Sequence, residues 1–299
     1  MVWRSCSLLS ILLCLSCNRE INNDFQWQTY SADAAGSKYA PLNQIDTTNV
    51  GQLKLAWTYT CGDYRQAPAS TIQCNPIIID GIAYITTPGL KVVALDAATG
   101  TERWKFDPYE GQSGSGVNRG VTYWSSGDDR RIFYVAGAWL YALDAATGLP
   151  IPSFGQGGKV DLYEGLGREL RHTWVTAATP GIIFQDLLIL GSTLGEGPGA
   201  AAPGHLRAFD VHTGDQRWIF HTIPYPGEAG YDTWPTDAWQ RTGGANAWGG
   251  FTLDAARGWV FCGTGSAPFD HYGGGRPGAH LFSHPLPAPG AASRQRGRA

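Results

Sequence analysis

A tryptophan set among glycines is the residue that most suggests a ligand site. Residues 243–250 read Gly-Gly-Ala-Asn-Ala-Trp-Gly-Gly, and an apolar run that ends in Gly-Thr-Gly follows at 259–265. Because glycine has no side chain, a planar ligand could lie flat on the Trp248 indole ring without a clash. The same pattern is also typical of a core tryptophan in a glycine-rich sheet, and Trp248 by itself does not separate the two interpretations.

Two charged residues add to this hypothesis. Glu196 ends the motif Gly-Ser-Thr-Leu-Gly-Glu, which follows the buried-strand pattern at 187–190 and so lies at a strand end, where loops gather at one face. A carboxylate there suits a hard cation, and a solvated loop acid is the alternative. Arg119 lies in Asn-Arg-Gly-Val-Thr and could bind an anion or form a surface ion pair. We expect His172, His205 and His271 to be structural or exposed rather than ligands.

A repeated unit must position these residues. Three segments share the pattern Ala-x-Asp-x-x-Thr-Gly, namely 94–100, 142–148 and 208–214, and lead to Trp104, Phe154 and Trp218. In each, an Asp can accept turn N–H groups, a Gly closes the hairpin and an aromatic residue starts the returning strand. A further strand pair precedes each turn, so four strands recur about every 50 residues, as in the blades of a β-propeller. A sandwich fold would not explain the repeated turns.

Composition agrees with an all-β protein. The 299 residues include 40 Gly, 12 Trp and one Met, and glycine is poor in helices whereas aromatic residues favour strands. The net charge of −3 offers no basic surface, so we expect no nucleic-acid partner.

The order of motifs resembles the pyrroloquinoline quinone (PQQ)-dependent dehydrogenases. The resemblance covers about residues 27–276, and its densest part is the opening signature. That signature comprises Tyr30-x-x-Asp33, the run Gly-Ser-Lys-Tyr-Ala-Pro-Leu-Asn-Gln-Ile at 36–45, and Asn49-Val50-x-x-Leu53-x-x-Ala56-Trp57. The family is an eight-bladed propeller, so the resemblance implies that about four blades are present here.

The resemblance also implies a cofactor site. Residues Arg119, Thr193, Asn246 and Trp248 would bind PQQ, with Arg119 facing one of its carboxylates and Trp248 forming the floor. Glu196 would bind a calcium ion beside the quinone, and Ser266 stands where the family has a second metal ligand, an Asn. The family's general base, an Asp, has no counterpart in this sequence, so we assign no catalytic residue.

The substrate is a sugar or an alcohol on this interpretation. Ser113 and Gly114 occupy the place where the alcohol-oxidising branch has adjacent cysteines, which favours the glucose type. The electron acceptor would be a quinone or a cytochrome c. The alternative is a non-catalytic PQQ-like propeller lipoprotein that acts as a binding or outer-membrane assembly scaffold, because such proteins share the repeated docking motif.

The two ends of the chain differ from its middle. Residues 1–17 resemble a signal peptide whose lipobox ends at Cys17, which predicts a periplasmic lipoprotein anchored to the membrane through lipid on Cys17. Residues 18–276 are expected to form the amino-terminal half of the propeller. Residues 277–299, rich in Pro and Arg, are expected to be irregular, to have little to bury, and to be an out-of-frame or truncated end of the enzyme, with a genuine basic tail as the alternative.

Three cysteines remain outside the predicted signal peptide. They are Cys61, Cys74 and Cys262, and no CxxC or Cys/His cluster accompanies them, which argues against zinc. A bridge between Cys61 and Cys74 is one possible pairing in an oxidising compartment, with Cys262 left as a buried thiol.

Overall fold

The strands form four consecutive antiparallel sheets. The computed structural model describes residues 25–170, 172–195, 201–269, 272–274 and 276–293. The first sheet comprises β1 (Ile77–Ile79), β2 (Ile82–Thr86), β3 (Val92–Asp96) and β4 (Glu102–Phe106); the second comprises β5 (Thr122–Ser126), β6 (Asp129–Ala136), β7 (Trp139–Asp144) and β8 (Lys159–Asp161). The third comprises β10 (Ile182–Phe184), β11 (Leu187–Leu190), β13 (Leu206–Asp210) and β14 (Gln216–Phe220); the fourth comprises β15 (Phe251–Asp254) and β16 (Trp259–Cys262).

Little else is regular. A short ladder joins β9 (Val175–Thr176) to β12 (Thr193–Leu194), and three single-turn helices are η1 (Val50–Gln52), η2 (Tyr231–Thr233) and α1 (Ala238–Arg241). No helix in the described ranges is long and apolar enough to cross a membrane. The predicted all-β propeller with about four blades is therefore confirmed as three four-stranded blades and one partial blade.

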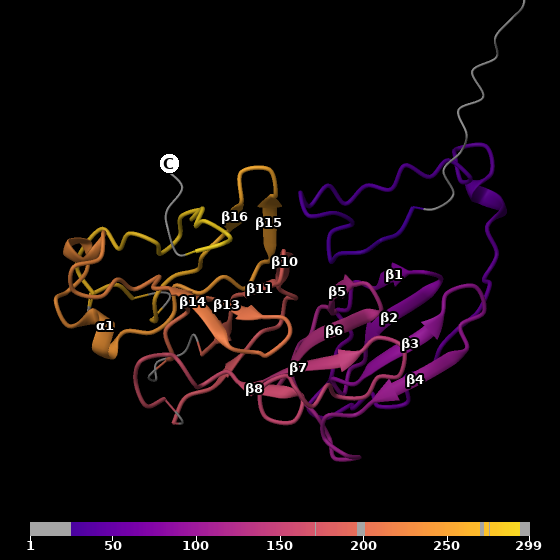
Figure 1. Cartoon of the computed structure of the whole chain (residues 1–299), viewed down its shortest axis with the longest axis horizontal. Coiled ribbons are helices and arrows are strands. Elements are labelled where there is room, and N and C mark those ends of the chain that lie inside the picture. Colours follow the sequence, from indigo (N-terminus) through magenta and orange to yellow (C-terminus); the bar gives the residue numbers. More distant parts are fainter. Residues whose placement is uncertain (1–24, 171, 196–200, 270–271, 275, 294–299) are drawn as a thin grey trace, which may run out of the picture.

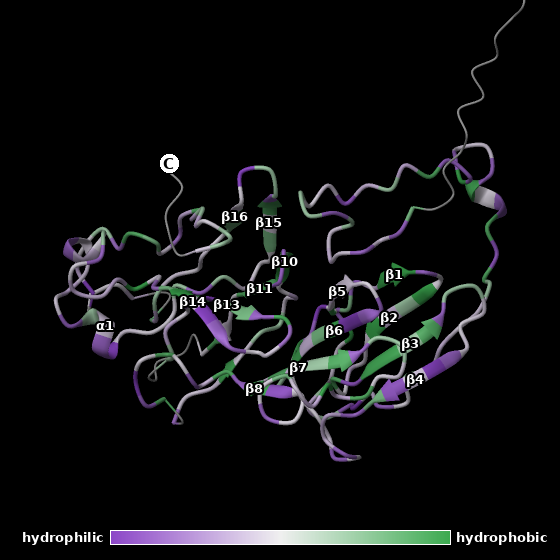
Figure 2. Ribbon diagram, in the orientation of Figure 1, coloured by the Kyte–Doolittle hydropathy of each residue, from purple (hydrophilic) through white to green (hydrophobic). Residues whose placement is uncertain are grey.

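The blades are arranged as an arc. Figure 1 shows the inner strands β1, β5, β10 and β15 following one another, with the outer strands β4, β8 and β14 on the other side. Middle strands such as β3 are almost fully buried, whereas β4 is largely exposed, and Figure 2 shows the same contrast as green against purple. The opening segment runs across the inner side: the Trp27 carbonyl accepts a hydrogen bond from Ile78, and the Ala34 carbonyl accepts one from Leu253.

The repeated turns close as the sequence predicts. In the first unit Oδ1 of Asp96 accepts hydrogen bonds from the backbone N–H of Thr99 at 3.0 Å and of Ala98 at 3.2 Å, and the turn ends at Gly100 with φ of 72°. Oδ1 of Asp144 and Asp210 accepts the corresponding bonds in the next two units. Only a residue without a Cβ adopts that positive φ without strain, which explains the Gly at this position.

Trp57 of the opening segment and Trp104 of the first unit each dock on the turn of the following blade. The indole N–H of Trp57 donates to the Ala97 carbonyl at 3.2 Å, and that of Trp104 donates to the Ala145 carbonyl at 3.0 Å. A Cβ added at Gly100 would lie 2.5 Å from the Trp57 ring, and one added at Gly148 would lie 2.4 Å from Trp104. The glycine therefore closes the turn and also lets the indole lie against it.

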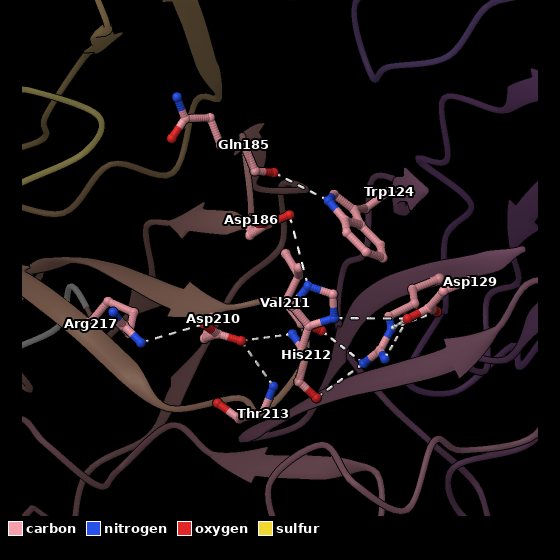
Figure 3. A network of polar contacts seen from close by, with 10 residues as sticks. Trp124, Asp129, Gln185, Asp186, Asp210, Val211, His212, Thr213 and Arg217 are labelled. Atoms are coloured by element: carbon pink, nitrogen blue, oxygen red, sulfur yellow. Dashed lines mark hydrogen bonds and ion pairs between the residues drawn. The ribbon is translucent and has the colours of Figure 1, made fainter. Parts of the chain in front are cut away.

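The second unit contacts the next blade through a different side chain, because Phe154 has no side-chain N–H. Nη1 of Arg131, on β6, donates instead to the carbonyls of Val211 at 2.9 Å and His212 at 3.1 Å. Asp129 holds this guanidinium through hydrogen bonds to Nε at 2.8 Å and to Nη2 at 2.7 Å. Figure 3 shows Trp124 and Asp129 of the second blade facing Asp186, Val211 and His212 of the third across this junction.

The proline-rich tail is more ordered than expected. Residues 285–291 lie along β16: N–H groups of Val260 and Cys262 donate to the carbonyls of Pro289 at 3.1 Å and Pro287 at 3.4 Å. Ala291 is fully buried, and its carbonyl accepts the indole N–H of Trp218 at 3.2 Å. The expectation that the tail has little to bury was wrong, because a proline loses its N–H but keeps its carbonyl, and prolines spaced two apart present these carbonyls to one strand.

The three cysteines among the described residues are free thiols. Cys61 and Cys74 are not bridged, and Cys262 is buried as expected. The Cys74 sulfur accepts a hydrogen bond from the backbone N–H of Thr86 at 3.2 Å. The bridge considered between Cys61 and Cys74 is therefore not present in this structure.

Candidate functional site

Three side chains meet at the inner edge of the arc. The inner strands of blades two, three and four begin at Thr122, Ile182 and Phe251, and the residues three positions before them are Arg119, Thr179 and Trp248. Because the blades repeat, equal offsets from the strand starts bring residues that are distant in the sequence to one edge. The site is thus built by the repeat itself.

A chain of hydrogen bonds connects these three residues. Nη1 of Arg119 donates to Oγ1 of Thr179 at 3.1 Å, and that hydroxyl donates to the backbone carbonyl of Trp248 at 2.5 Å. The guanidinium carbon lies 5.7 Å from the centre of the Trp248 ring, which places the charge near an aromatic face. Thr179 therefore links the charged group to the aromatic group.

The backbone fixes Arg119 from both sides. Its N–H donates to the Ala178 carbonyl of the third blade at 2.7 Å, and its carbonyl accepts the N–H of Asn75 from the first blade at 2.8 Å. In the described part of the chain its guanidinium contacts a hydroxyl and an indole ring, and no carboxylate pairs with it. Among the described residues the guanidinium is therefore left available for an anionic ligand.

Trp248 is not a core tryptophan. Its side chain is 45% exposed, whereas its neighbours Ala247 and Asn246 are buried. A Cβ at Gly249 would meet no atom within 4 Å, and one at Gly265 would lie 3.4 Å from the indole nitrogen. The glycines therefore leave open space beside the ring, as the sequence indicated.

Asn246 and Thr193 support this edge through the backbone. Nδ2 of Asn246 donates to the Ser192 carbonyl at 2.9 Å, and the Asn246 carbonyl accepts the N–H of Gly265 at 3.0 Å. Oγ1 of Thr193 accepts the N–H of Ala178 at 3.2 Å, directly before Thr179. Both residues hold the loops around Trp248 together, and their predicted contact with PQQ stays a prediction.

The predicted metal ligands are only partly visible. Glu196 lies outside the described residues, and Ser266 follows β16, where its carbonyl accepts the N–H of Ala245 at 2.9 Å. Asn246 connects the two loops, since it bonds to Ser192 of one and Gly265 of the other. Among the described residues no three His, Cys, Asp or Glu side chains gather as a metal centre. The metal assignment stays a prediction.

Behind Asn246 lies a buried histidine. A Cβ at Gly204 would lie 2.4 Å from Asn246, and the next residue, His205, is 2% exposed. Nδ1 of His205 accepts the N–H of Thr222 at 3.2 Å. Burial holds the pKa of His205 well below its usual range, so the ring is neutral. The expected structural role of His205 is consistent with this burial; His172 is exposed, and His271 is outside the described residues.

Thr179 and Ser192 were not anticipated from the sequence. Thr179 lies in Ala-Ala-Thr-Pro-Gly, which reads as an ordinary loop before a strand. The signal that could have found it is positional, because it occupies the same offset before its strand as Arg119 and Trp248 do before theirs. Ser192 contributes through its backbone carbonyl. Every residue has such a carbonyl, so the residue type does not indicate this role.

Comparisons with known proteins agree with this architecture. Residues 27–292 match the family described as PQQ glucose/ethanol/alcohol dehydrogenase, beta-propeller domain. The dehydrogenase subunit of a quinone alcohol dehydrogenase from Gluconacetobacter polyoxogenes is 32% identical over 86% of this chain and 35% of its own. Quinoprotein glucose dehydrogenase A of Acinetobacter calcoaceticus is 30% identical over 84% of this chain and 34% of its own.

A solved structure shows the same arrangement. The quinohemoprotein alcohol dehydrogenase of Pseudomonas putida HK5 superposes with a TM-score of 0.73 at 27% identity, over 92% of this chain and 40% of its own. The fold is that of a partial β-propeller. The chain belongs to the family of PQQ-dependent dehydrogenase propeller domains. It spans about a third of the length of the curated relatives it matches.

Proposed function

We propose that this chain supplies the cofactor-binding edge of a PQQ-dependent dehydrogenase that oxidises a sugar or an alcohol. The arrangement of Arg119, Thr179 and Trp248 is the observation that carries the proposal. A half-exposed indole ring with open space beside it suits a planar ring system, and a guanidinium with no carboxylate partner among the described residues suits an anionic substituent. PQQ is planar and carries carboxylates, so the residues present fit it.

The roles of the individual residues follow from their contacts. Trp248 would form the floor, and Arg119 would bind a carboxylate, held in direction by Thr179. Asn246 and Thr193 would border the cofactor, while Glu196 and Ser266 would provide oxygen ligands for a calcium ion. These residues would thus hold a cofactor that supplies hydride-accepting chemistry for a CH–OH group, and a metal that supplies Lewis acidity. Electrons would then pass to a quinone or a cytochrome c.

The lid described for the alcohol-oxidising branch has no counterpart here. A Cβ at Gly114 would lie 2.3 Å from the Gly89 carbonyl and 2.4 Å from the Tyr109 ring. A pair of adjacent cysteines at 113–114 would therefore not fit without a backbone shift. This supports the glucose-type branch, in which the far face of the cofactor is covered differently.

The cofactor assignment is tested by titrating PQQ with calcium into the 299-residue protein and following the quenching of tryptophan fluorescence. Arg119→Ala should weaken binding by roughly tenfold or more, because a hydrogen bond to a charged group contributes about 1.5–3 kcal/mol. Trp248→Ala should weaken it several-fold through lost stacking of about 0.5–1.5 kcal/mol. The control is Arg217→Ala, on the outer strand β14, where Arg217 pairs with Asp210 at 3.6 Å. A folded protein that ignores PQQ would favour the scaffold interpretation.

We also propose that the protein is exported to the periplasm and anchored through lipid on Cys17. The support is the short apolar run before Leu-Ser-Cys in the sequence, and Cys17 itself lies outside the described residues. The test is membrane partitioning after expression. Partitioning that persists unchanged in Cys17→Ser would contradict lipidation.

A further inference from the structure

A cavity lies between the first and second blades, away from the candidate cofactor site. Its volume is about 300 Å³, which falls within the range of small-molecule sites in proteins. The residues that line it include Ile82, Tyr84, Arg103, Trp104, Tyr123 and Arg130. Arg130 follows the turn that ends β5, whereas Arg119 precedes β5, so these two arginines lie at opposite ends of the same inner strand.

Shorter side chains at two repeated positions account for this cavity. Ile82 of the first blade and Arg131 of the second each pair with the Asp of their own blade's turn motif, so they occupy equivalent positions. Counted from the same Asp, Ala146 in the turn of the second blade corresponds to His212 in the turn of the third. The junction between blades one and two therefore has Ile82 and Ala146 where the next junction has Arg131 and His212.

At that next junction the larger side chains pack between the blades. Arg131 is buried and bonds to the backbone of the third blade, and the His212 ring lies edge-on to Trp124 with the ring centres 4.8 Å apart. The two nitrogens of His212 lie 3.8 Å from Asp129 and from Asp186, as Figure 3 shows. An isoleucine and an alanine do not reach as far, which leaves space at the first junction.

Aromatic rings form the inner wall of the cavity. The Tyr84 hydroxyl donates to the Ala145 carbonyl at 3.2 Å, and the indole N–H of Trp104 donates to the same carbonyl at 3.0 Å. The centres of these two rings are 5.9 Å apart, and Tyr123 lines the cavity as a third ring. Burial raises the pKa of Tyr84 to about 12, so its phenol is neutral. Because the polar groups of Tyr84 and Trp104 are already bonded, these rings offer a ligand their aromatic surface.

Two arginines lie at the rim of the cavity, and each is about half exposed. Arg130 pairs with Asp80 at 3.1 Å, and Arg103 pairs with Asp96 at 2.6 Å. Each pair uses one terminal nitrogen, and among the described residues these two guanidinium groups donate no other hydrogen bond. A guanidinium carries several N–H donors, so donors remain for an acceptor on a ligand. A carboxylate is the acceptor that matches a guanidinium best.

We propose that this cavity binds a small aromatic carboxylate. The ring lies among Tyr84, Trp104 and Tyr123, and the carboxylate bonds to Arg103 or Arg130 at the rim. An aromatic ring is favoured over an aliphatic chain, because ring–ring contacts contribute beyond the area that they bury. The bound molecule contacts both the first and the second blade, so it also stabilises their junction.

The test uses naphthoate, the carboxylate of naphthalene, titrated into the full 299-residue protein by isothermal titration calorimetry. Naphthamide is the uncharged analogue, and the acid should bind about two- to fivefold more tightly, as expected for pairing with an exposed arginine. Ala146→His introduces the side chain of the next junction and should abolish binding of both compounds. Ala98→His is the matched control, because Ala98 has the same position in the turn of the first blade and does not line the cavity.

Further variants locate the probe within the protein. Replacing both rim arginines, by Arg103→Gln and Arg130→Gln, should remove the preference for the acid while naphthamide still binds. Trp248→Ala, in the candidate cofactor site, should leave the affinity for naphthoate unchanged. Binding that is lost in Trp248→Ala but retained in Ala146→His would place naphthoate at the cofactor site and overturn the proposal. Equal affinity of the wild type for the acid and the amide would also overturn it, as would no binding to a wild-type protein with the circular dichroism of a folded sheet protein.

Discussion

Arg131 is expected to hold the second and third blades together more strongly than any neighbouring charge. Its side chain is 8% exposed, and its guanidinium bonds to the carbonyls of Val211 and His212 and to both oxygens of Asp129. Arg131→Met removes the cation, leaves Asp129 unpaired and deprives both carbonyls of a donor. Breaking a buried pair by removing one partner costs about 3–5 kcal/mol. Asp129 is partly exposed, so we expect the lower part of that range.

The adjacent residue provides the control. Arg130 is 51% exposed and pairs with Asp80 at 3.1 Å, an exposed ion pair whose loss costs less than about 1 kcal/mol. Both variants are compared by urea unfolding, with the slope of each transition checked against the wild type. Equal destabilisation by Arg130→Met and Arg131→Met would refute the assignment of Arg131 as the replacement for an indole donor. Arg131→Lys should recover only part of the loss, because an ammonium cannot match the planar fork.

Three further predictions follow from burial and from the missing base. The pKa of His205 is lowered in the folded state, so at low pH the unfolded chain binds a proton that the folded chain does not. The free energy of unfolding should therefore fall as the pH drops below about 6.5. Urea unfolding at pH 7.5 and 5.5 should show this difference, and His205→Gln should reduce it. Burial raises the pKa of Cys262 to about 12, so its thiol should not react with a thiol reagent at pH 8 until the protein unfolds. Labelling of Cys262 in the folded protein as fast as that of an exposed thiol would contradict this. The 299-residue protein should not oxidise sugars or alcohols with PQQ, calcium and a dye acceptor, because none of its residues matches the Asp that the family resemblance implies as general base. Sustained turnover would place the catalytic centre elsewhere.

Local rules explain the features that the sequence predicted well. The Asp-x-x-Thr-Gly turns close through bonds between residues two and three positions apart, so residue type alone specifies them. The indole docking of Trp104 also follows, since every unit offers the same carbonyl and the same glycine. The role of Arg131 could not be predicted in this way. It depends on Phe154 standing where the other units have a tryptophan, and on Arg131 lying close enough in the fold to donate in its place.

The contacts that form the site depend on distant pieces. Oγ1 of Thr179 donates to the carbonyl of Trp248, which is 69 positions away in the sequence. The packing of blades three and four brings the two residues into contact. The prediction for the tail at 277–299 was wrong for another reason. It treated the prolines as strand breakers and did not consider their carbonyl groups as hydrogen-bond acceptors. Spaced two apart, these carbonyls suit an outer position against β16.

The contacts between blades also determine how the residues of the candidate site are placed. Arg119 bonds through its backbone to the first and third blades, and through its side chain to Thr179, which bonds to the fourth. No single blade could therefore hold the guanidinium over the Trp248 ring, because its direction is set by three neighbours at once. We therefore expect Trp104 and Arg131, which join neighbouring blades at the outer side, to influence the inner edge as well. Substitutions far from the cofactor should then weaken ligand binding in proportion to how much they loosen a blade junction.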